Sequence, residues 1–257
     1  MTKVVDMADA QQKRLVPAID RAVMVLDLIA AEPGVAGVSE LARRLGLAKS
    51  SVHGICDTLC ALGLLRVAGS GFEMGPRSLH WSASFLDRSD LVSEFERILS
   101  EDRRLDDYTV TLSTLSGAEV MYLACRNAAK PLGFTFQLGM RLPAIYTATG
   151  KAMLSLMESE QRQALLAGPW PAAFTANSVA SPEALEGQFS EWRQLGYALD
   201  RGEIRDGMVC LGAAVKDRSG KPVAGIAISM TSAEASAAAL KHCGVIVGEL
   251  AAKLMVR

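Results

Sequence analysis

The segment from Val38 to Gly75 restricts the possible folds of this chain more than any other, because it predicts two short helices, a tight turn and a β-hairpin in succession. Ser39 suits the N-cap of the first helix, Gly46 permits the turn, and the second helix starts near Ala48. Alternating apolar and polar residues from Arg66 to Gly75, around a Gly-Ser-Gly turn, predict a β-wing. A helix-turn-helix with a wing is typical of DNA-binding domains, so gene regulation is the leading hypothesis.

The second helix of this pair has one apolar and one polar face. Helical spacing predicts that its buried positions are Val52, Ile55, Cys56, Leu59 and Cys60. The polar face carries Lys49, Ser50, Ser51, His53, Gly54 and Thr58, concentrated toward the N-terminal turns. A recognition helix presents that part to base edges and phosphates. An ordinary αα-hairpin with a solvated polar face is the alternative interpretation, since such hairpins are common.

An amphipathic helix is predicted upstream, from about Pro17 to Ala31. Pro17 suits its first turn, and the Glu32-Pro33-Gly34 sequence ends it. Its apolar positions at helical spacing are Ile19, Ala22, Val23, Leu26, Leu28 and Ile29. The three helices and the wing together predict a compact head that ends near Gly75.

The charge of this head gives little support to DNA binding, because residues 1–80 carry almost as many acidic as basic side chains. Affinity for phosphate would have to come from local groups, multiplied by the use of more than one head, which favours an oligomer. The local basic groups are Lys13, Arg14, Arg21, Arg43, Arg44 and Lys49.

The rest of the chain predicts an α+β domain. A helical pattern over residues 76–107 breaks near residues 88–90 and precedes strands at 109–115 and 119–125. Two further strands, at 208–216 and 222–230, flank an Asp-Arg-Ser-Gly turn. Helices are predicted at 150–157, 160–167, 182–195 and 232–254. An antiparallel sheet with segregated helices is a usual place for a small-ligand pocket.

Composition limits the cellular setting. Half of the residues are hydrophobic, which is enough to bury real cores, and no apolar run is long enough for a membrane span or a signal peptide. We therefore expect a cytoplasmic protein. The five cysteines show no CxxC spacing, so neither a disulfide framework nor a structural zinc site is expected. No cofactor is predicted.

An enzyme is the competing class, but its motifs are incomplete. The Thr149-Gly150-Lys151 sequence hints at a phosphate loop, yet Ile145 and Ala152 stand where a Walker A motif needs glycine and a hydroxyl residue. The three histidines are scattered, and Cys210 has no evident histidine partner. A third possibility is a ligand sensor whose head binds protein without specific DNA contact; salt-sensitive affinity for duplex DNA would separate the two.

From about Pro17 to Lys253 the chain resembles IclR-type transcriptional regulators. The motifs that carry the resemblance are Leu41-Ala42-x-x-Leu45-Gly46-Leu47-x-Lys49-Ser50-Ser51-Val52, Gly139-x-Arg141-x-Pro143-x-x-x-Thr147-Ala148-Thr149-Gly150-Lys151-Ala152, Gly196-Tyr197-Ala198 with Glu203, Gly207 and Cys210, and Asp217-x-x-Gly220. Their order and spacing make the match specific.

The resemblance implies an all-α winged helix-turn-helix domain at residues 14–75, a linker helix at 76–88 and an α+β, GAF-like effector and oligomerisation domain at 89–257. It further implies homodimers or homotetramers that bind palindromic operators on double-stranded DNA. The DNA-binding residues expected on this basis and from the polar face are Arg21, Arg43, Arg44, Lys49, Ser50, Ser51, His53 and Thr58.

The resemblance also implies a small organic or aromatic acid as effector. Its pocket contacts match Ala148, Thr149, Asp200, Met208, Cys210, Ala227 and Ser229. A physical reason supports the first two: the turn at Thr147 to Thr149 directly precedes a predicted helix, whose unpaired N–H groups and positive dipole end attract an anion. The alternatives are a capped core helix and a surface aspartate.

Two positions depart from the family pattern. Gly54 stands where the family commonly has an arginine, so one contact to DNA is missing and the helix is weakened by roughly 1 kcal/mol relative to alanine. Ala227 stands where some relatives have a serine, which suggests a less polar pocket.

Overall fold

The chain divides into two compact units, residues 1–88 and 89–257. A computed structural model describes residues 16–31, 37–86, 90–128 and 132–254. Lys13 and Arg14, which the sequence suggested as phosphate contacts, lie outside the described residues.

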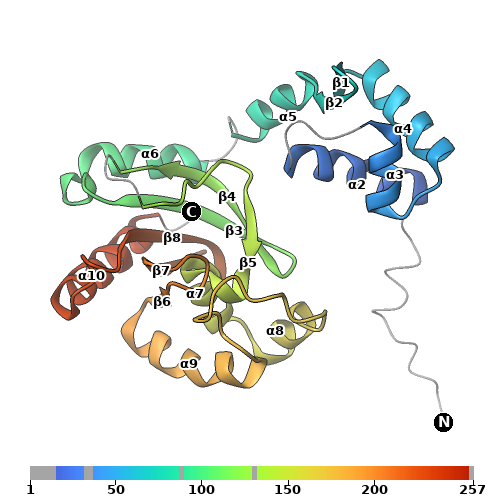
Figure 1. The fold of residues 1–257 in the computed structure, drawn as a ribbon. Coiled ribbons are helices and arrows are strands. Elements are labelled where there is room, and N and C mark those ends of the chain that lie inside the picture. The colour runs from blue at the N-terminus through green and yellow to red at the C-terminus, as the bar shows by residue number, and fades with distance from the viewer. Residues whose placement is uncertain (1–15, 32–36, 87–89, 129–131, 255–257) are drawn as a thin grey trace, which may run out of the picture. The chain divides into compact units, whose positions relative to one another are not determined.

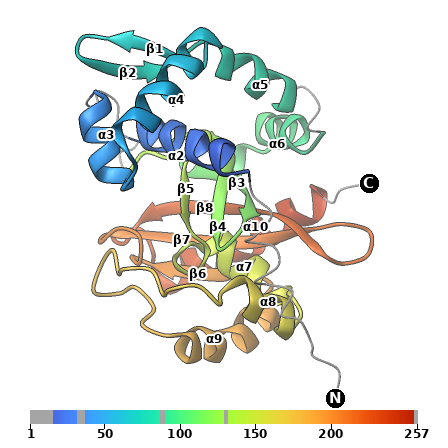
Figure 2. The ribbon, with the colours of Figure 1, turned by 90° about the vertical axis from the view of Figure 1, so that its right-hand side faces the viewer.

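The first unit, called the head below, is a winged helix-turn-helix (Figure 1). Its elements are α2 (Pro17–Ala31), α3 (Val38–Leu45), α4 (Lys49–Ala61), β1 (Leu65–Ala68), β2 (Gly71–Met74) and α5 (Arg77–Leu86). The antiparallel β1–β2 hairpin is the predicted wing, and it projects beyond α4 (Figure 2). Gly46 adopts the left-handed conformation (φ 65°) that ends α3, and the next N–H, that of Leu47, donates to the carbonyl of Ala42.

The core of the head contains the predicted apolar face of α4, with Val52, Cys56 and Leu59 buried and Ile55 and Cys60 partly buried. The prediction for α2 was wrong in detail, because Ile19 and Val23 are 64% and 48% exposed. Val25 and Ile29, one turn apart, are the buried positions of α2. The predicted positions Ala22, Leu26 and Leu28 are partly buried against the same core.

Ser39 is not the N-cap of α3. Gly37 takes that position, since its carbonyl accepts the N–H groups of Glu40 and Leu41, and Ser39 lies inside the first turn. The wing turn packs directly against Gly37, because a Cβ at this position would lie 2.7 Å from the carbonyl oxygen of Ser70. A residue with a side chain, such as serine, would not fit at this N-cap.

The second unit is built on a six-stranded antiparallel sheet in the order β5-β4-β3-β8-β7-β6. Its strands are β3 (Thr109–Ser116), β4 (Glu119–Arg126), β5 (Arg141–Pro143), β6 (Ala198–Arg201), β7 (Met208–Lys216) and β8 (Pro222–Thr231). Its helices are α6 (Asp90–Glu101), α7 (Ala148–Leu156), α8 (Ser159–Leu165), α9 (Pro182–Leu195) and α10 (Ala237–Lys253), with 3-10 turns at Arg103–Leu105 and Ala144–Tyr146. The α+β prediction is confirmed.

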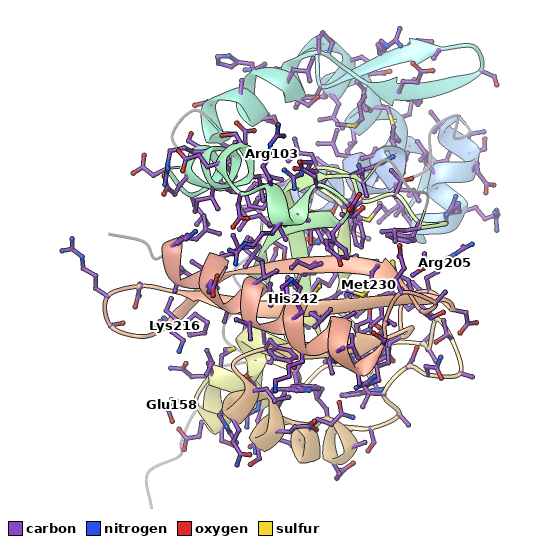
Figure 3. The ribbon with its side chains drawn as sticks, turned by 90° about the vertical axis from the view of Figure 1, so that its left-hand side faces the viewer. Arg103, Glu158, Arg205, Lys216, Met230 and His242 are labelled. Carbon is purple, nitrogen blue, oxygen red and sulfur yellow. The ribbon has the colours of Figure 1, made fainter. Side chains whose placement is uncertain are left out.

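The second unit is layered. Helix α7 packs between the sheet and α9 (Figure 1), while α10 packs on β7 and β8 and crosses in front of the strands when viewed from its own side (Figure 3). Alternate residues of β7 explain the layers: Gly212 faces α7, whereas the buried side chains of Leu211 and Ala213 point to the other face.

The closing helix starts later than predicted. Residues 232–235 form a turn in which the side chain of Glu234 accepts the N–H and the hydroxyl of Thr231. Ser236 then caps α10, accepting the N–H of Ala239 at 3.2 Å. Ser232, where the helix was predicted to begin, lies instead in this turn. The turn is stabilised because the Glu234 side chain accepts two hydrogen bonds from Thr231 at the end of β8.

Candidate DNA-binding surface and ligand cavity

The first turn of α4 presents predicted DNA-binding residues to the outside. Lys49 and Ser50 are exposed and Ser51 is half-buried. The N-cap is Ala48, which makes no side-chain hydrogen bond to the helix. The first N–H groups of α4 are therefore not capped by a side chain, and with the lysine beside them they form a surface suited to a phosphate oxygen.

The other predicted DNA-binding residues are exposed but spread over three helices. Arg43 on α3 donates from Nε to Glu40 at 2.9 Å, and Arg44 follows it at the same helix end. On α4, His53 Nδ1 lies 3.4 Å from the Asp57 carboxylate, and the Thr58 hydroxyl donates to the Gly54 carbonyl at 2.8 Å. Arg21 lies on α2.

The wing contributes a basic residue that the sequence prediction did not include. Arg66 on β1 is exposed and pairs across the hairpin with Glu73. The alternation of the wing sequence was the signal that could have placed Arg66 on its outer face.

The predicted effector contacts meet in one cavity of the second unit, called the α7 cavity below. All seven line it: Ala148, Thr149, Asp200, Met208, Cys210, Ala227 and Ser229. The remaining wall consists of Thr111, Tyr122, Phe136, Thr147 and Ile204. Thr111 stands opposite Ala227 in the β3–β8 ladder, so its place in the wall depends on a strand pairing that the sequence does not give, and Phe136 follows no regular pattern. The cavity has about 10 Å³ of room, enough for about one water molecule.

Two glycines allow the start of α7 to pack closely on β7 and β8 beside this cavity. A Cβ on Gly212 of β7 would lie 2.6 Å from the backbone nitrogen of Thr149, and a Cβ on Gly225 of β8 would lie 2.7 Å from the Thr149 Cβ. Thr147 caps the helix by accepting the Gly150 N–H at 3.1 Å. Helical geometry leaves the N–H groups of Ala148 and Thr149 without partners inside the helix, and both residues line the cavity.

Burial raises the pKa of the acidic groups that line the α7 cavity, which favours their neutral forms. Asp200 is 1% exposed and accepts the N–H of Glu203 at 2.6 Å, and burial raises the pKa of its carboxyl to about 7. Burial also raises the pKa of the Cys210 thiol and the Tyr122 phenol well above their usual values. A protonated thiol is a poor nucleophile, so the cavity suits binding better than covalent catalysis.

A buried ion pair fixes strand β6, which carries Asp200, and the loop that follows it. Lys151 of α7 has a fully buried side chain that pairs with Glu203 and donates to the Leu199 carbonyl at 3.2 Å. The ring of Trp192 lies 5.3 Å from the ammonium. The other oxygen of Glu203 accepts the N–H of Val179 at 3.0 Å. The pair therefore connects α7, α9 and the loop after β6.

The described part of the chain contains no group of three histidine, cysteine, aspartate or glutamate side chains arranged to hold a metal ion. No helix in it has the length and apolar character needed to cross a bilayer.

Comparison with known proteins gives two matching families. The family described as bacterial transcriptional regulator IclR C-terminal matches residues 83–255, and the IclR helix-turn-helix domain matches residues 18–69. Together they span both units.

Individual relatives match along most of their length. The HTH-type transcriptional regulator BhcR of Paracoccus denitrificans is 30% identical over 239 residues, which cover 92% of this chain and 85% of BhcR. The crystal structure of the repressor BlcR of Agobacterium tumefaciens is 43% identical, with a TM-score of 0.61, and the match covers 94% of this chain and 98% of BlcR. An IclR homologue of Microbacterium hydrocarbonoxydans, solved with 4-hydroxybenzoate, shares the fold at 21% identity and a TM-score of 0.73, covering 92% and 97%.

Proposed function

Because the chain belongs to the IclR family of bacterial transcriptional regulators, we propose that it binds promoter DNA through its head and that a small organic or aromatic acid in the α7 cavity changes this binding. The family consists of regulators and not of enzymes. The observation that carries the proposal is the start of α7, which lines a buried cavity together with an aspartate, a thiol and hydroxyl groups.

The DNA contacts proposed are the groups predicted from the sequence. Lys49, Ser50 and Ser51 would meet base edges and phosphates at the uncapped start of α4. Arg21, Arg43, Arg44, His53 and Thr58 would contact the flanking backbone, and the wing residue Arg66 joins this set. Since the head carries little net charge, we propose a homodimer or homotetramer that binds a palindromic operator. Residues 14–75 would form the DNA-binding domain, 76–88 the linker and 89–257 the effector and oligomerisation domain.

The acid would place its carboxylate on the N–H groups of Ala148 and Thr149, at the positive end of α7. Asp200 and Ser229 would hydrogen-bond a hydroxyl at the other end, and Met208, Cys210 and Ala227 would supply apolar wall. The Microbacterium homologue, solved with a hydroxylated aromatic acid, supports this class of effector. Ala227 favours an apolar portion on the ligand.

The size of the cavity links binding to regulation. Room for about one water does not admit an aromatic acid, so a ligand must move the wall. The wall residue that we expect to move is Phe136, because it lies in a segment without helix or strand. Its ring centroid lies 5.1 Å from that of Tyr122. A ligand that binds only the opened cavity shifts the population toward that state, and we propose that the linker helix then changes the spacing of the heads.

The proposal is tested by capturing genomic fragments on the purified protein at physiological salt, with and without pooled organic and aromatic acids. We expect enrichment of a few promoters and a change with one acid pool. Linkage requires that an acid that alters operator affinity binds with altered affinity when operator is saturating. Uniform weak retention would contradict the DNA part and favour a sensor acting through protein contacts, while promoter enrichment that no acid changes would contradict the effector part.

A further inference from the structure

A second hollow lies in the C-terminal unit, beside the part of the β7 edge that β6 does not cover; it is called the β7 hollow below. Strand β6 pairs with β7 only as far as Gly212, whereas β7 continues to Lys216. The hollow measures about 320 Å³ and shares no lining residue with the α7 cavity. Small-ligand pockets begin at roughly this volume.

The lining of the β7 hollow explains its volume. Short residues contributed by α7, β7, α10 and the end of α9 surround it: Ala152, Gly196, Ala213, Gly248, Ala251 and Ala252. Trp192, which is 4% exposed, supplies a flat aromatic wall. Beyond Gly212 the edge of β7 has no strand beside it among the described residues, so backbone hydrogen-bonding groups border the hollow.

Two glycines one turn apart on α10 differ in what surrounds them. A Cβ on Gly244 would lie 2.3 Å from the ring of Tyr197, so this glycine is required by packing. A Cβ on Gly248 would meet no atom within 4 Å. Glycine destabilises the interior of a helix relative to alanine, and it is characteristic of places where a ligand approaches the backbone closely. No contact within the described part of the chain requires glycine at 248.

The charged residues of the β7 hollow are both cationic. Arg193 donates from Nη1 to the Ser155 carbonyl at 3.1 Å, which holds its guanidinium at the hollow. Lys216 projects from the end of β7 near the β7–β8 turn (Figure 3). No carboxylate lines the hollow, and neither cation forms an ion pair within the described part of the chain. An anionic group would complement both.

We propose that the β7 hollow is a second ligand site, separate from the α7 cavity, for a small organic anion with a flat apolar body. The anionic group lies between Arg193 and Lys216, and the apolar body lies on Trp192 and the alanines. This chemistry follows from the lining: two cations at the rim, the aromatic side chains of Trp192 and Tyr197, and no acidic group.

The test uses the full chain and 2-naphthoate as probe, with binding measured by calorimetry. Gly248→Leu fills the hollow from a position with open space around it. Gly187→Leu is the matched control, because Gly187 is also a helix-interior glycine with nothing within 4 Å of its Cβ position, and it lies outside the hollow. If Gly248→Leu fails to fold, Ala252→Leu at the exposed rim replaces it.

We expect one naphthoate per chain at the hollow in the wild type and in Gly187→Leu, and at least tenfold weaker binding in Gly248→Leu. Replacing Arg193 and Lys216 together by glutamine should weaken binding and remove most of its salt dependence. Equal binding by Gly248→Leu and the control would overturn the proposal, as would a lack of binding by the wild type at millimolar probe. Binding that Ala227→Leu abolishes and Gly248→Leu leaves unchanged assigns the probe to the α7 cavity and also overturns it.

A second copy of the chain is the other occupant that the uncovered β7 edge could accept. Sedimentation velocity of Gly248→Leu and Gly187→Leu separates the two cases. A change of assembly state in Gly248→Leu alone, with naphthoate binding unchanged, would make the hollow an interface and overturn the proposal. The same assembly state in both variants, with naphthoate binding lost only in Gly248→Leu, supports it.

Discussion

The head and the C-terminal unit differ in where they keep their polar groups. All buried polar and charged side chains of the described residues lie between Thr109 and Ser229, in the C-terminal unit, and the described part of the head has none. The head therefore presents its chemistry on a surface, as binding to a long polyanion requires. The C-terminal unit keeps hydroxyls, a lysine, an arginine and two carboxylates in its interior, where each is costly without a partner.

This difference predicts where substitutions are tolerated. In the head, polar residues can be exchanged with little loss of stability but with loss of DNA affinity. In the C-terminal unit the same kinds of exchange should unfold the domain or change its response to pH. Four comparisons between variants test this contrast.

The largest effect is expected for Lys151→Met, which removes the cation of the fully buried pair and leaves Glu203 uncompensated. Breaking a buried pair from one side costs roughly 3–5 kcal/mol of unfolding free energy. The measurement is urea unfolding followed by tryptophan fluorescence. Arg43→Met in the exposed Glu40 pair of the head is the control and should change stability far less. Similar losses in both variants would contradict the contrast.

Asp200→Asn should change the pH dependence of stability. The folded carboxyl has a pKa of about 7 against an ordinary value of 3.8, so folding favours its neutral form. The stabilisation is full below the ordinary pKa and is lost as pH rises toward 7. Relative to Asp200→Asn, the wild type should lose about 3 kcal/mol of unfolding free energy between pH 5 and pH 8.

The control for this pH dependence is Asp217→Asn. Asp217 is an exposed turn residue whose pKa is lowered, chiefly by the hydroxyl of Ser219, so any stability it confers is lost only below its ordinary pKa. Its variant should follow the wild type between pH 5 and pH 8. If the unfolding free energy of the wild type and of Asp200→Asn changed equally with pH, the buried carboxyl would not be the cause of the pH dependence.

Glycines give a third contrast, with opposite signs in the two units. Gly212→Ala puts a Cβ 2.4 Å from the backbone of Ala148, so α7 must shift, at a cost of roughly 1–3 kcal/mol and with loss of acid binding. Gly54→Ala in α4 meets nothing within 4 Å and should stabilise the head by about 1 kcal/mol. Thermal unfolding of both variants shows whether each midpoint rises or falls. A lower midpoint for Gly54→Ala would contradict the open space that surrounds Gly54 in the structure.

The parts of the fold that sequence patterns predicted are those with long periodic segments. Helix α9 and strand β7 have the predicted bounds, and α2 does as well. Strands β5 and β6, with three and four residues, are too short for an alternation to be detected, and both were missed. The sequence predicts a helix at the turn before α10, because serine and alanine suit a helix. The contacts of Glu234 that form the turn are seen only in the folded chain.

The α7 cavity shows a different limit. Its seven predicted lining residues come from strands and a helix far apart in the chain, and only the family resemblance grouped them. Spacing in the sequence contains no information on which strand pairs with which, so Thr111 and Tyr122 were missed although they alternate correctly. The contracted volume and the partner of Lys151 depend on packing across the whole domain, which a local pattern cannot contain.

The smallest effect is expected on the surface of the head. Lys49→Gln removes one cation beside the uncapped start of α4 and touches no buried group, so the unfolding midpoint should not move. Each lost phosphate contact weakens DNA binding roughly tenfold at about 0.1 M salt and lowers the slope of log affinity against log salt by about 0.9 per head. Fluorescence anisotropy with a captured promoter fragment, repeated over a series of salt concentrations, measures both quantities. Ser50→Ala, without a charge change, should leave the slope intact. A lower midpoint in Lys49→Gln would show that the head, like the C-terminal unit, depends on its polar groups for stability, and the contrast between the two units would fail.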